Sequence, residues 1–322
     1  MPKKELYILT FFLLFSFEIS AQKIDDFVST SSGKVQGYLE NKVMNYDDIP
    51  YAKPPVGDLR WKAPREILDS ERVIENKDNN FCIQEPSSMG GAPGEGILTG
   101  SEDCLYLDIK TPKKKSSELL PVMFWIHGGG NTSGLKDLYD YSKMVTRHDV
   151  IVVTINYRLG AFGWFTHPSI QGNQEGLDKA SNFGTLDIIQ ALKWVNKNIE
   201  LFGGDSNNIT IFGESAGGHN VLSLMVSPQA KGLFHKAISQ SGYTTSASTG
   251  EAFAIDETHP TFNHTSNEVV KRLINNHDSL SSEDLYKRLL GLSAEEFFRE
   301  YSDKSNLEVP LLTNDGIVIP LE

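Results

Sequence analysis

Four short apolar runs follow Pro121, and polar or helical segments separate them. They cover residues 122–126 (VMFWI), 150–157 (VIVVTINY), 209–212 (ITIF) and 236–240 (KAISQ). Runs of this length that are rich in β-branched residues are typical of buried strands. Because strands alternate with helical segments, the pattern predicts an α/β fold with a mostly parallel sheet and helices on its faces.

A helix is expected between the second and third of these runs. Its apolar positions recur three or four residues apart, and they are Leu186, Ile189, Leu192, Val195 and Ile199. This spacing places them on one face of a helix, and Gly203–Gly204 gives the helix an end. The segment therefore reads as an α/β crossover.

The chain becomes polar and helical after Gly242. Helical periods begin at Glu268, Asp284 and Glu295, which predicts a helical insertion over the sheet. The last residues, 309–322 (VPLLTNDGIVIPLE), are expected to form a loop that returns to the sheet.

The first residues have the order of a signal peptide. Lys3 and Lys4 precede an apolar run from Leu6 to Phe17, and small residues follow up to Ala21. A buried N-terminal strand is the alternative, and the run is too short to span a bilayer. We therefore expect a signal peptide over 1–21, one domain over 22–322, and a secreted or periplasmic protein with no stable membrane anchor.

The charge of the chain disfavours one class of partner. Its formal net charge is -12, and its one basic stretch is Lys113–Lys115. A protein that follows a phosphate backbone needs a basic face. We expect no nucleic-acid partner.

The chain contains two cysteines, Cys82 and Cys104. An even number of cysteines in an exported protein favours a disulfide, although two unrelated buried thiols remain the alternative. No paired histidines accompany them at zinc-ligand spacing, so no metal and no cofactor are expected. The segment from Glu85 to Ser101 between them is rich in Gly, Ser and Pro and is a candidate lid loop.

The strongest local signal is the G-x-S-x-G motif of residues 213–217 (GESAG). The run ITIF precedes it and a helix-compatible segment follows it. A serine between a strand and a helix is typical of a nucleophile elbow, in which the helix N-terminus stabilises negative charge. An ordinary strand-to-helix turn is the competing interpretation.

A second signal is His127-Gly128-Gly129-Gly130, directly after the run VMFWI. Glycines at this place leave backbone N–H groups bare, and such groups can bind the oxyanion of a tetrahedral intermediate. A flexible loop is the alternative. The elbow later in the same chain favours the catalytic interpretation.

Six segments in register resemble the type-B carboxylesterase (cholinesterase-like) family. They are 51–64 (YAKPPVGDLRWKAP), 102–107 (EDCLYL), 127–130 (HGGG), 156–160 (NYRLG), 182–205 and 213–218 (GESAGG). The resemblance covers nearly the whole chain after the expected signal peptide. It implies an α/β-hydrolase fold and a serine carboxylic ester hydrolase that works through an acyl-enzyme.

The resemblance also implies roles for single residues. Ser215 resembles the nucleophile, and the N–H groups of Gly129, Gly130 and Ala216 resemble the oxyanion hole. Glu214 would be a buried acid beside the nucleophile, and Ser241 a hydroxyl near the catalytic histidine. Two further pairings are implied: a disulfide between Cys82 and Cys104, and structural ion pairs of Arg60 with Glu102 and of Arg158 with Asp187.

The triad glutamate and histidine of this family have no counterpart in the chain. The family places both of them beyond the region that resembles residues 315–320 (DGIVIP). The histidines after Ser215 are expected to be ordinary solvated side chains, and they are His219, His235, His259, His264 and His277. We therefore expect a domain that is incomplete at its C-terminus and, as written, nearly inactive.

The substrate expectation comes from what lies between the cysteines. Cholinesterases hold a quaternary ammonium group against an aromatic ring there, and residues 83–103 contain no aromatic residue. A small uncharged ester is therefore expected. A non-catalytic adhesion or binding protein of the same fold is the alternative function, but such members commonly lose the serine that is intact here.

Overall fold

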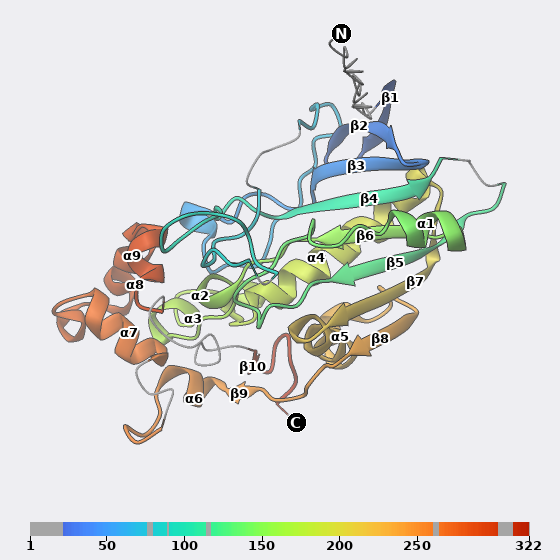
Figure 1. The fold of residues 1–322 in the computed structure, drawn as a ribbon. Coiled ribbons are helices and arrows are strands. Elements are labelled where there is room, and N and C mark those ends of the chain that lie inside the picture. Colours follow the sequence, from blue (N-terminus) through green and yellow to red (C-terminus); the bar gives the residue numbers. More distant parts are fainter. Residues whose placement is uncertain are drawn as a thin grey trace, which may run out of the picture.

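A computed structural model describes residues 22–75, 80–88, 90–113, 117–259, 264–301 and 312–321. The expected signal peptide, 1–21, lies outside the described residues. Figure 1 shows a central sheet that runs through the molecule, with a group of helices beyond one of its ends.

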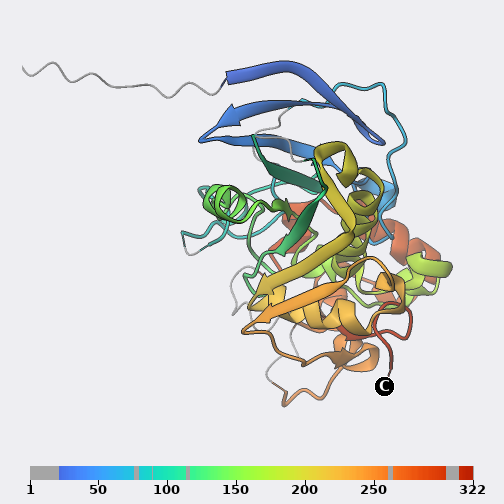
Figure 2. The same ribbon diagram turned by 90° about the vertical axis from the view of Figure 1, so that its right-hand side faces the viewer.

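The central sheet has eight strands in the order β1-β2-β3-β4-β6-β5-β7-β8. The strands are β1 (Gln22–Thr30), β2 (Gly33–Glu40), β3 (Val43–Pro50), β4 (Tyr106–Pro112), β5 (Leu120–Ile126), β6 (Ile151–Ile155), β7 (Gly204–Glu214) and β8 (Lys236–Gln240). The direction of the strands turns steadily from one edge to the other (Figure 2), as expected of a twisted sheet.

The parallel half of the sheet confirms the sequence prediction. β5 pairs in parallel with β6 and β7, and β7 pairs in parallel with β8. All five residues of β6 (IVVTI) are buried, which explains their continuous apolar run. The run 150–157 overstates this strand, because β6 ends at Ile155 and residues 156–157 lie beyond it.

The antiparallel half of the sheet, β1 to β4, was not predicted. Each of these strands pairs antiparallel with the next, and β4 joins β6 in the same sense. In β2 and β3, buried and half-buried residues alternate over part of the strand. Polar residues on the half-buried face break up the apolar runs on which the prediction relied.

Helices cover both faces of the sheet (Figure 2). α1 (Ser142–His148) lies on one face, and α4 (Phe183–Asn198) and α5 (Ala216–Val226) lie on the other. α4 is the predicted crossover helix. A short 3-10 turn (Ile199–Phe202) extends it, and Gly203 ends that turn in the left-handed conformation, with φ of 86°.

The predicted helical insertion is present after β8. Its helices are α6 (Thr249–Phe253), α7 (Ser266–Leu273), α8 (Ser282–Gly291) and α9 (Ala294–Phe298). α7 to α9 gather beyond one end of the sheet, near the short helices α2 (Gly160–Gly163) and α3 (Pro168–Gln171) (Figure 1). Serine caps begin α6, α8 and α9.

The prediction for the last segment is wrong in one respect. Residues 312–321 do not return to the central sheet. β10 (Thr313–Asn314) pairs with β9 (Ala247–Ser248) in a separate two-stranded sheet. Asn182 holds it there, because its side chain donates to the Thr313 carbonyl and accepts from the Thr313 N–H.

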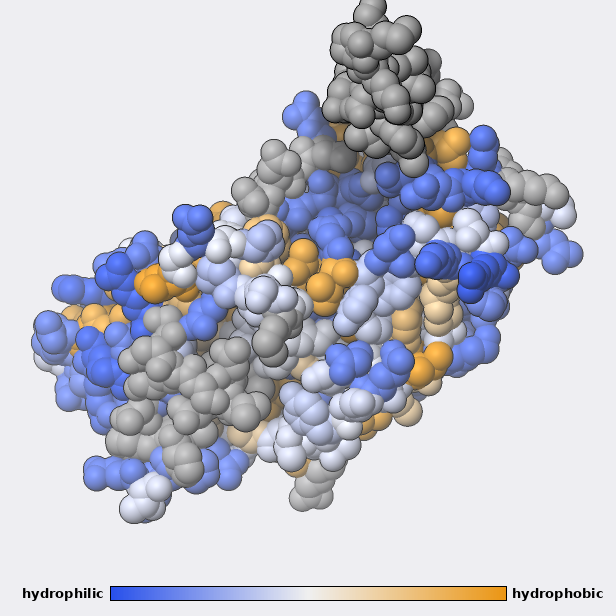
Figure 3. Space-filling view, in the orientation of Figure 1, coloured by the Kyte–Doolittle hydropathy of each residue, from blue (hydrophilic) through white to orange (hydrophobic). Residues whose placement is uncertain are grey.

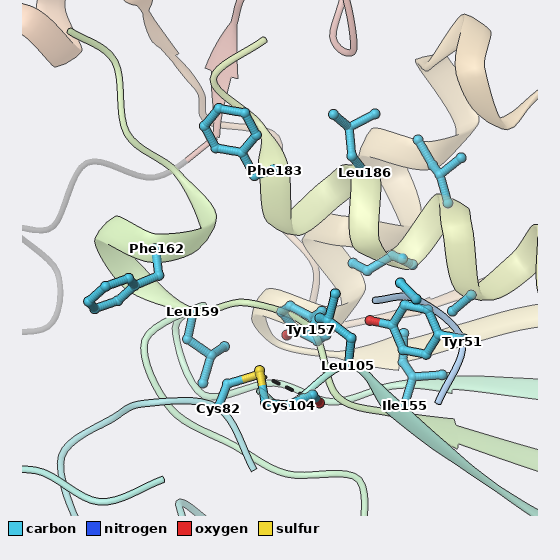
Figure 4. Packing of buried hydrophobic residues seen from close by; sticks show 14 of the residues in the cluster. Tyr51, Cys82, Cys104, Leu105, Ile155, Tyr157, Leu159, Phe162, Phe183 and Leu186 are labelled. Carbon is cyan, nitrogen blue, oxygen red and sulfur yellow. Dashed lines mark hydrogen bonds between the residues drawn. A yellow bond between two sulfur atoms is a disulfide. The ribbon is translucent and has the colours of Figure 1, made fainter. Parts of the chain in front are cut away.

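The core is continuous around the Cys82–Cys104 disulfide, which the structure contains. Figure 4 shows the disulfide among Leu105, Tyr157 and Leu159. Both expected ion pairs are also present. Arg60 and Glu102 are 2.6 Å apart, and Arg158 and Asp187 are 2.7 Å apart with side chains 3% and 0% exposed.

The outer strand β8 differs from the other parallel strands in its exposure. All five of its residues are exposed, and Ile238 is 46% exposed. Among the described residues no strand pairs with its outer side. On the face shown in Figure 3, apolar residues form separate groups between polar ones. No described helix is long and apolar enough to cross a membrane.

Candidate active site

Ser215 occupies a sharp turn between β7 and α5. Its backbone has φ of 55° and ψ of −121°, a combination that residues other than glycine rarely adopt. The Ser215 N–H donates to the carbonyl of Gln240 at 2.9 Å, and its own carbonyl accepts from the His219 N–H at 3.0 Å. Ser215 thus has the strand-turn-helix setting that the sequence predicted.

Two glycines make this turn possible. A Cβ atom on Gly217 would lie 2.1 Å from the carbonyl oxygen of Ile126, at the end of β5. A Cβ atom on Gly213 would lie 2.5 Å from the carbonyl carbon of Gly217. The motif therefore needs glycine on both sides of the serine, because α5 begins in contact with the backbone of β5.

The loop after β5, residues 127–134, lies against the elbow. A Cβ atom on Gly128 would lie 2.7 Å from the Glu214 carbonyl oxygen and 3.3 Å from the Ser215 Cβ. Gly129 and Gly130 have φ of 95° and 64°, in the left-handed region. We call residues 127–134 the oxyanion loop below.

The internal hydrogen bonds of this loop use the N–H groups of Thr132 and Ser133. The Gly129 carbonyl accepts from the N–H groups of Thr132 and Ser133, at 3.1 and 3.0 Å. Among the described residues, no backbone hydrogen bond outside the helices and strands uses the N–H of Gly129 or Gly130. The N–H groups of Gly129, Gly130 and Ala216, the first residue of α5, stay the predicted donors to an oxyanion.

His127 is part of the support of the loop. Its ring stacks on Tyr157 with centroids 4.3 Å apart, and its Nδ1 is 2.8 Å from the Gly128 carbonyl oxygen. Burial lowers the pKa of His127 to about 4, although the bond to Gly128 acts in the opposite direction. The imidazole is therefore neutral near pH 7.

The prediction for Glu214 as a buried acid is wrong. Glu214 is the last residue of β7, and it is exposed. It pairs in register with Gln240 of β8, the exposed outer strand, so the described residues do not cover it. Ser241 directly follows β8 and is also exposed, with φ of 52°.

Two of the five histidines contradict the prediction that they are solvated. His219 and His264 are only 4% and 1% exposed. His219 is buried because α5 packs against β7 and β8, and its ring lies 4.2 Å from that of Tyr243. Burial lowers the pKa of His219 to about 4, and its Nδ1 has no hydrogen-bond partner among the described residues.

The candidate lid loop is tied to the oxyanion loop by Gln84, which the sequence analysis missed. The Gln84 Oε1 accepts from the N–H groups of Ala92 and Gly134, both at 2.9 Å. Its Nε2 donates to the Gly134 carbonyl at 2.9 Å. A lone glutamine after a cysteine carries no sequence signal for this role.

Lys136 is a second missed residue. It is 2% exposed, and its Nζ lies 2.8 Å from Asp108, 2.9 Å from Asp137 and 3.0 Å from Asp48. Burial alone would lower the pKa of Lys136, but these carboxylates raise it by more. The segment after the oxyanion loop is thus fixed to β3 and β4 by charge.

A cavity of about 150 Å³ opens beside the oxyanion loop. Thr132 and Ser133 of the loop line one side. Residues of three other segments complete the wall, and they include the apolar Ile83, Leu159, Phe162 and Phe298 and the polar Glu85, Ser87 and Tyr301. Within the described residues, no group of three or more His, Cys, Asp or Glu side chains could hold a metal ion.

Known esterases are similar to this chain in sequence. The Bacillus subtilis para-nitrobenzyl esterase is 47% identical over 217 residues, which is 67% of this chain and 43% of that protein. The fumonisin B1 esterase of Sphingopyxis macrogoltabida is 40% identical over 220 residues, 66% of this chain and 39% of that protein. The chain therefore spans about two fifths of the length of these relatives.

Solved structures agree with the fold. A PNB esterase superposes with a TM-score of 0.75 at 35% identity, covering 91% of this chain and 58% of that one. A Geobacillus stearothermophilus carboxylesterase gives 0.74 at 34% identity, covering 91% and 56%. The chain thus has the α/β-hydrolase fold. The model of the carboxylesterase family matches residues 24–319, and the chain belongs to that family.

Proposed function

We propose that the full-length protein is a serine carboxylic ester hydrolase with Ser215 as its nucleophile. The observation that carries this proposal is the backbone of Ser215, held at φ of 55° and ψ of −121° beside Gly128. Such a conformation costs about 1–3 kcal/mol and persists where the surrounding structure enforces it. An ordinary turn has no need of it.

The reaction follows from this geometry. The Ser215 Oγ attacks the ester carbonyl carbon, and the N–H groups of Gly129, Gly130 and Ala216 donate to the resulting oxyanion. Collapse of the intermediate breaks the ester bond, releases the alcohol and leaves an acyl-enzyme. Water then attacks the acyl carbon and releases the acid and free Ser215. No cofactor enters these steps.

A general base must accept the proton of Ser215 before the attack. His219 is the histidine nearest to Ser215 in the sequence. It follows Ser215 by one helical turn within α5, so its side chain belongs to the helix that the elbow begins. We therefore propose that residues 1–322 by themselves hydrolyse esters only slowly, through the oxyanion hole alone.

Small uncharged esters are the proposed substrates. The cavity beside Thr132 and Ser133 is close to the size that holds a benzene ring, about 150 Å³. Its wall includes the apolar side chains of Ile83, Leu159 and Phe162, which suit an uncharged arm of the ester, beside polar residues such as Ser87 and Thr132. The para-nitrobenzyl esterase and the fumonisin B1 esterase, by their names, support esters as the substrates.

Export is a separate proposal. The order of residues 1–21 and the Cys82–Cys104 disulfide both support an extracytoplasmic protein. N-terminal sequencing of the protein recovered from its native host tests this proposal. A mature chain that begins after Ala21 supports it, and a mature chain that retains residues 3–17 contradicts it.

Two preparations test the enzymatic proposal: the full-length protein and residues 1–322. Each is treated with a fluorophosphonate probe and with p-nitrophenyl butyrate. We expect labelling and turnover for the full-length protein. Ser215→Ala should abolish the labelling and lower turnover by about 10³-fold or more. Ser223→Ala is the matched control, because Ser223 is a buried serine of the same helix that bonds to the His219 carbonyl.

Each outcome has a defined reading. Labelling that persists in Ser215→Ala would mean that another residue is the nucleophile. A folded full-length protein without labelling or turnover would favour a non-catalytic binding protein of this fold. Equal turnover by residues 1–322 and by the full-length protein would contradict the proposed slow rate of residues 1–322.

A further inference from the structure

A buried polar network joins the oxyanion loop to α5. Asn131, Tyr157 and Asn220 form it, and all three are 0% exposed. The Asn220 Nδ2 donates to the Asn131 Oδ1 at 2.8 Å, and the Asn131 Nδ2 is 3.5 Å from the Asn220 Oδ1. The Tyr157 hydroxyl is 2.6 Å from the His127 carbonyl oxygen and 3.3 Å from the Asn131 Oδ1.

The network joins the two halves of the candidate oxyanion hole. Asn131 directly follows Gly130, and Asn220 lies four residues after Ala216 in α5. Residues four apart in a helix share one face, and their side chains lean toward the N-terminus. The Asn131–Asn220 bond therefore connects the glycine segment to the end of α5 that carries Ala216.

The backbone of Asn131 contributes to the same arrangement. Its φ is 58°, in the left-handed region that asparagine tolerates better than most residues. Its carbonyl accepts from the Gly160 N–H at 2.7 Å. Asn131 is therefore fixed through its backbone to the segment after β6 and through its side chain to α5.

The glycines on the other side of Asn131 need such a tether. Gly128, Gly129 and Gly130 have no side chains to pack, so their own conformational freedom is high. Donors stabilise an oxyanion efficiently only when they are held in place before the reaction. We infer that Asn131 and Asn220 are positioning residues that hold the Gly129 and Gly130 amides in register with Ala216. This inference rests on the proposed ester hydrolysis.

Kinetics of variants of the full-length protein test the inference. Asn220→Ala removes the bond, Asn131→Gly removes it from the other side without opposing the positive φ, and the double variant completes a cycle. Ser223→Ala, a buried residue of the same helix, is the control. The measurements are kcat and KM for p-nitrophenyl butyrate, Ki for a trifluoromethyl ketone and the melting temperature.

A positioning role has a defined signature. We expect each single variant to lower kcat by 10-fold or more with KM within 3-fold of the parent, and Ki to rise in parallel with the fall in kcat/KM. The ketone forms a tetrahedral adduct with the serine, so its affinity reports the oxyanion hole directly. The double variant should resemble the worse single variant, because both changes break one contact.

Other results would overturn the inference. Unchanged kcat and Ki in a folded Asn220→Ala variant would do so, and so would fully additive effects in the double variant. If Asn220→Ala does not fold, Tyr157→Phe takes its place, because it removes a single hydroxyl while it keeps the ring that stacks on His127. A parent protein without turnover would instead contradict the proposed function, and that result is read before any variant.

Discussion

The ammonium group of Lys136 lies 2.8 Å from the carboxylate of Asp108 inside the fold, and two further aspartates complete its surroundings. Asp48 and Asp108 come from β3 and β4, whereas Lys136 follows the oxyanion loop by two residues. Burial raises the pKa of Asp108, and Lys136 opposes this rise. One cation therefore compensates two buried acids, Asp48 and Asp108, and a third, exposed one, Asp137.

Lys136→Met should destabilise the protein strongly. The substitution leaves Asp48 and Asp108 buried without their cation, and breaking a buried ion pair from one side costs about 3–5 kcal/mol. Lys287→Met is the control, because the side chains of the Lys287–Glu283 pair are 65% and 66% exposed and an exposed ion pair contributes little to stability. Denaturant unfolding measures the free energy of unfolding of both variants. Equal losses of stability would refute the structural role of Lys136 and its aspartates.

Gly217→Ala should prevent the elbow from forming. Its Cβ would lie 2.1 Å from the Ile126 carbonyl oxygen, which neither β5 nor α5 can avoid without moving. Gly291→Ala in α8 is the matched control, since a Cβ atom there meets nothing within 4 Å. We expect a lower melting temperature and lost probe labelling for the first variant and neither effect for the second.

Thr132→Trp should change the choice of ester. Thr132 lines the cavity of about 150 Å³, and an indole ring there would fill much of it. We expect kcat/KM for p-nitrophenyl benzoate to fall about 10-fold or more, with p-nitrophenyl acetate affected less, because one or two lost apolar contacts are worth about 1–3 kcal/mol. Thr132→Val controls for the loss of the hydroxyl. Equal losses for both esters would place the ester arm elsewhere.

Acid should destabilise the fold through three buried histidines. Burial lowers the pKa values of His127, His167 and His219 to about 4, and for His167 the nearby His277 adds to the effect. Unfolded histidine titrates near pH 6.5, so the unfolded state binds more protons between about pH 6.5 and 4. Stability is complete above this window and falls as the pH drops through it, by at most about 3 kcal/mol for each histidine.

Unfolding by denaturant at several pH values measures the slope of the free energy of unfolding against pH. His219→Gln should make the slope shallower between pH 6.5 and 4, because glutamine does not titrate. His235→Gln is the control, since His235 is exposed. An unchanged slope in His219→Gln would mean that His219 takes up its proton in the folded state.

The sequence was most informative where one kind of residue fulfils one local need. Gly213 and Gly217 flank the serine because any Cβ would meet backbone atoms, and this need is visible in the motif itself. The parallel strands were visible because both of their faces are buried, as in β6. The antiparallel strands β2 and β3 were not, because a half-buried strand leaves a weaker pattern.

Long-range polar contacts could not be predicted in the same way. Gln84 reaches Gly134 across 50 residues, and Asn131 reaches Asn220 across 89. Glutamine and asparagine are common surface residues, so their types did not reveal that they are buried here. The exposure of Glu214 was missed for a related reason, because it depends on which strand covers the end of β7.

The resemblance to the family implied the ion pairs of Arg60 and Arg158. The amino-acid sequence by itself also determined the family, the parallel strands, the crossover helix and the elbow at Ser215. Local periodicity and short motifs encode these features, because steric needs act between near neighbours in the chain. Only the tertiary structure decided how the glycine loop is held, that His219 is buried, and that Lys136 lies among aspartates. Such features depend on which distant segments the fold brings together, and no local pattern records that choice.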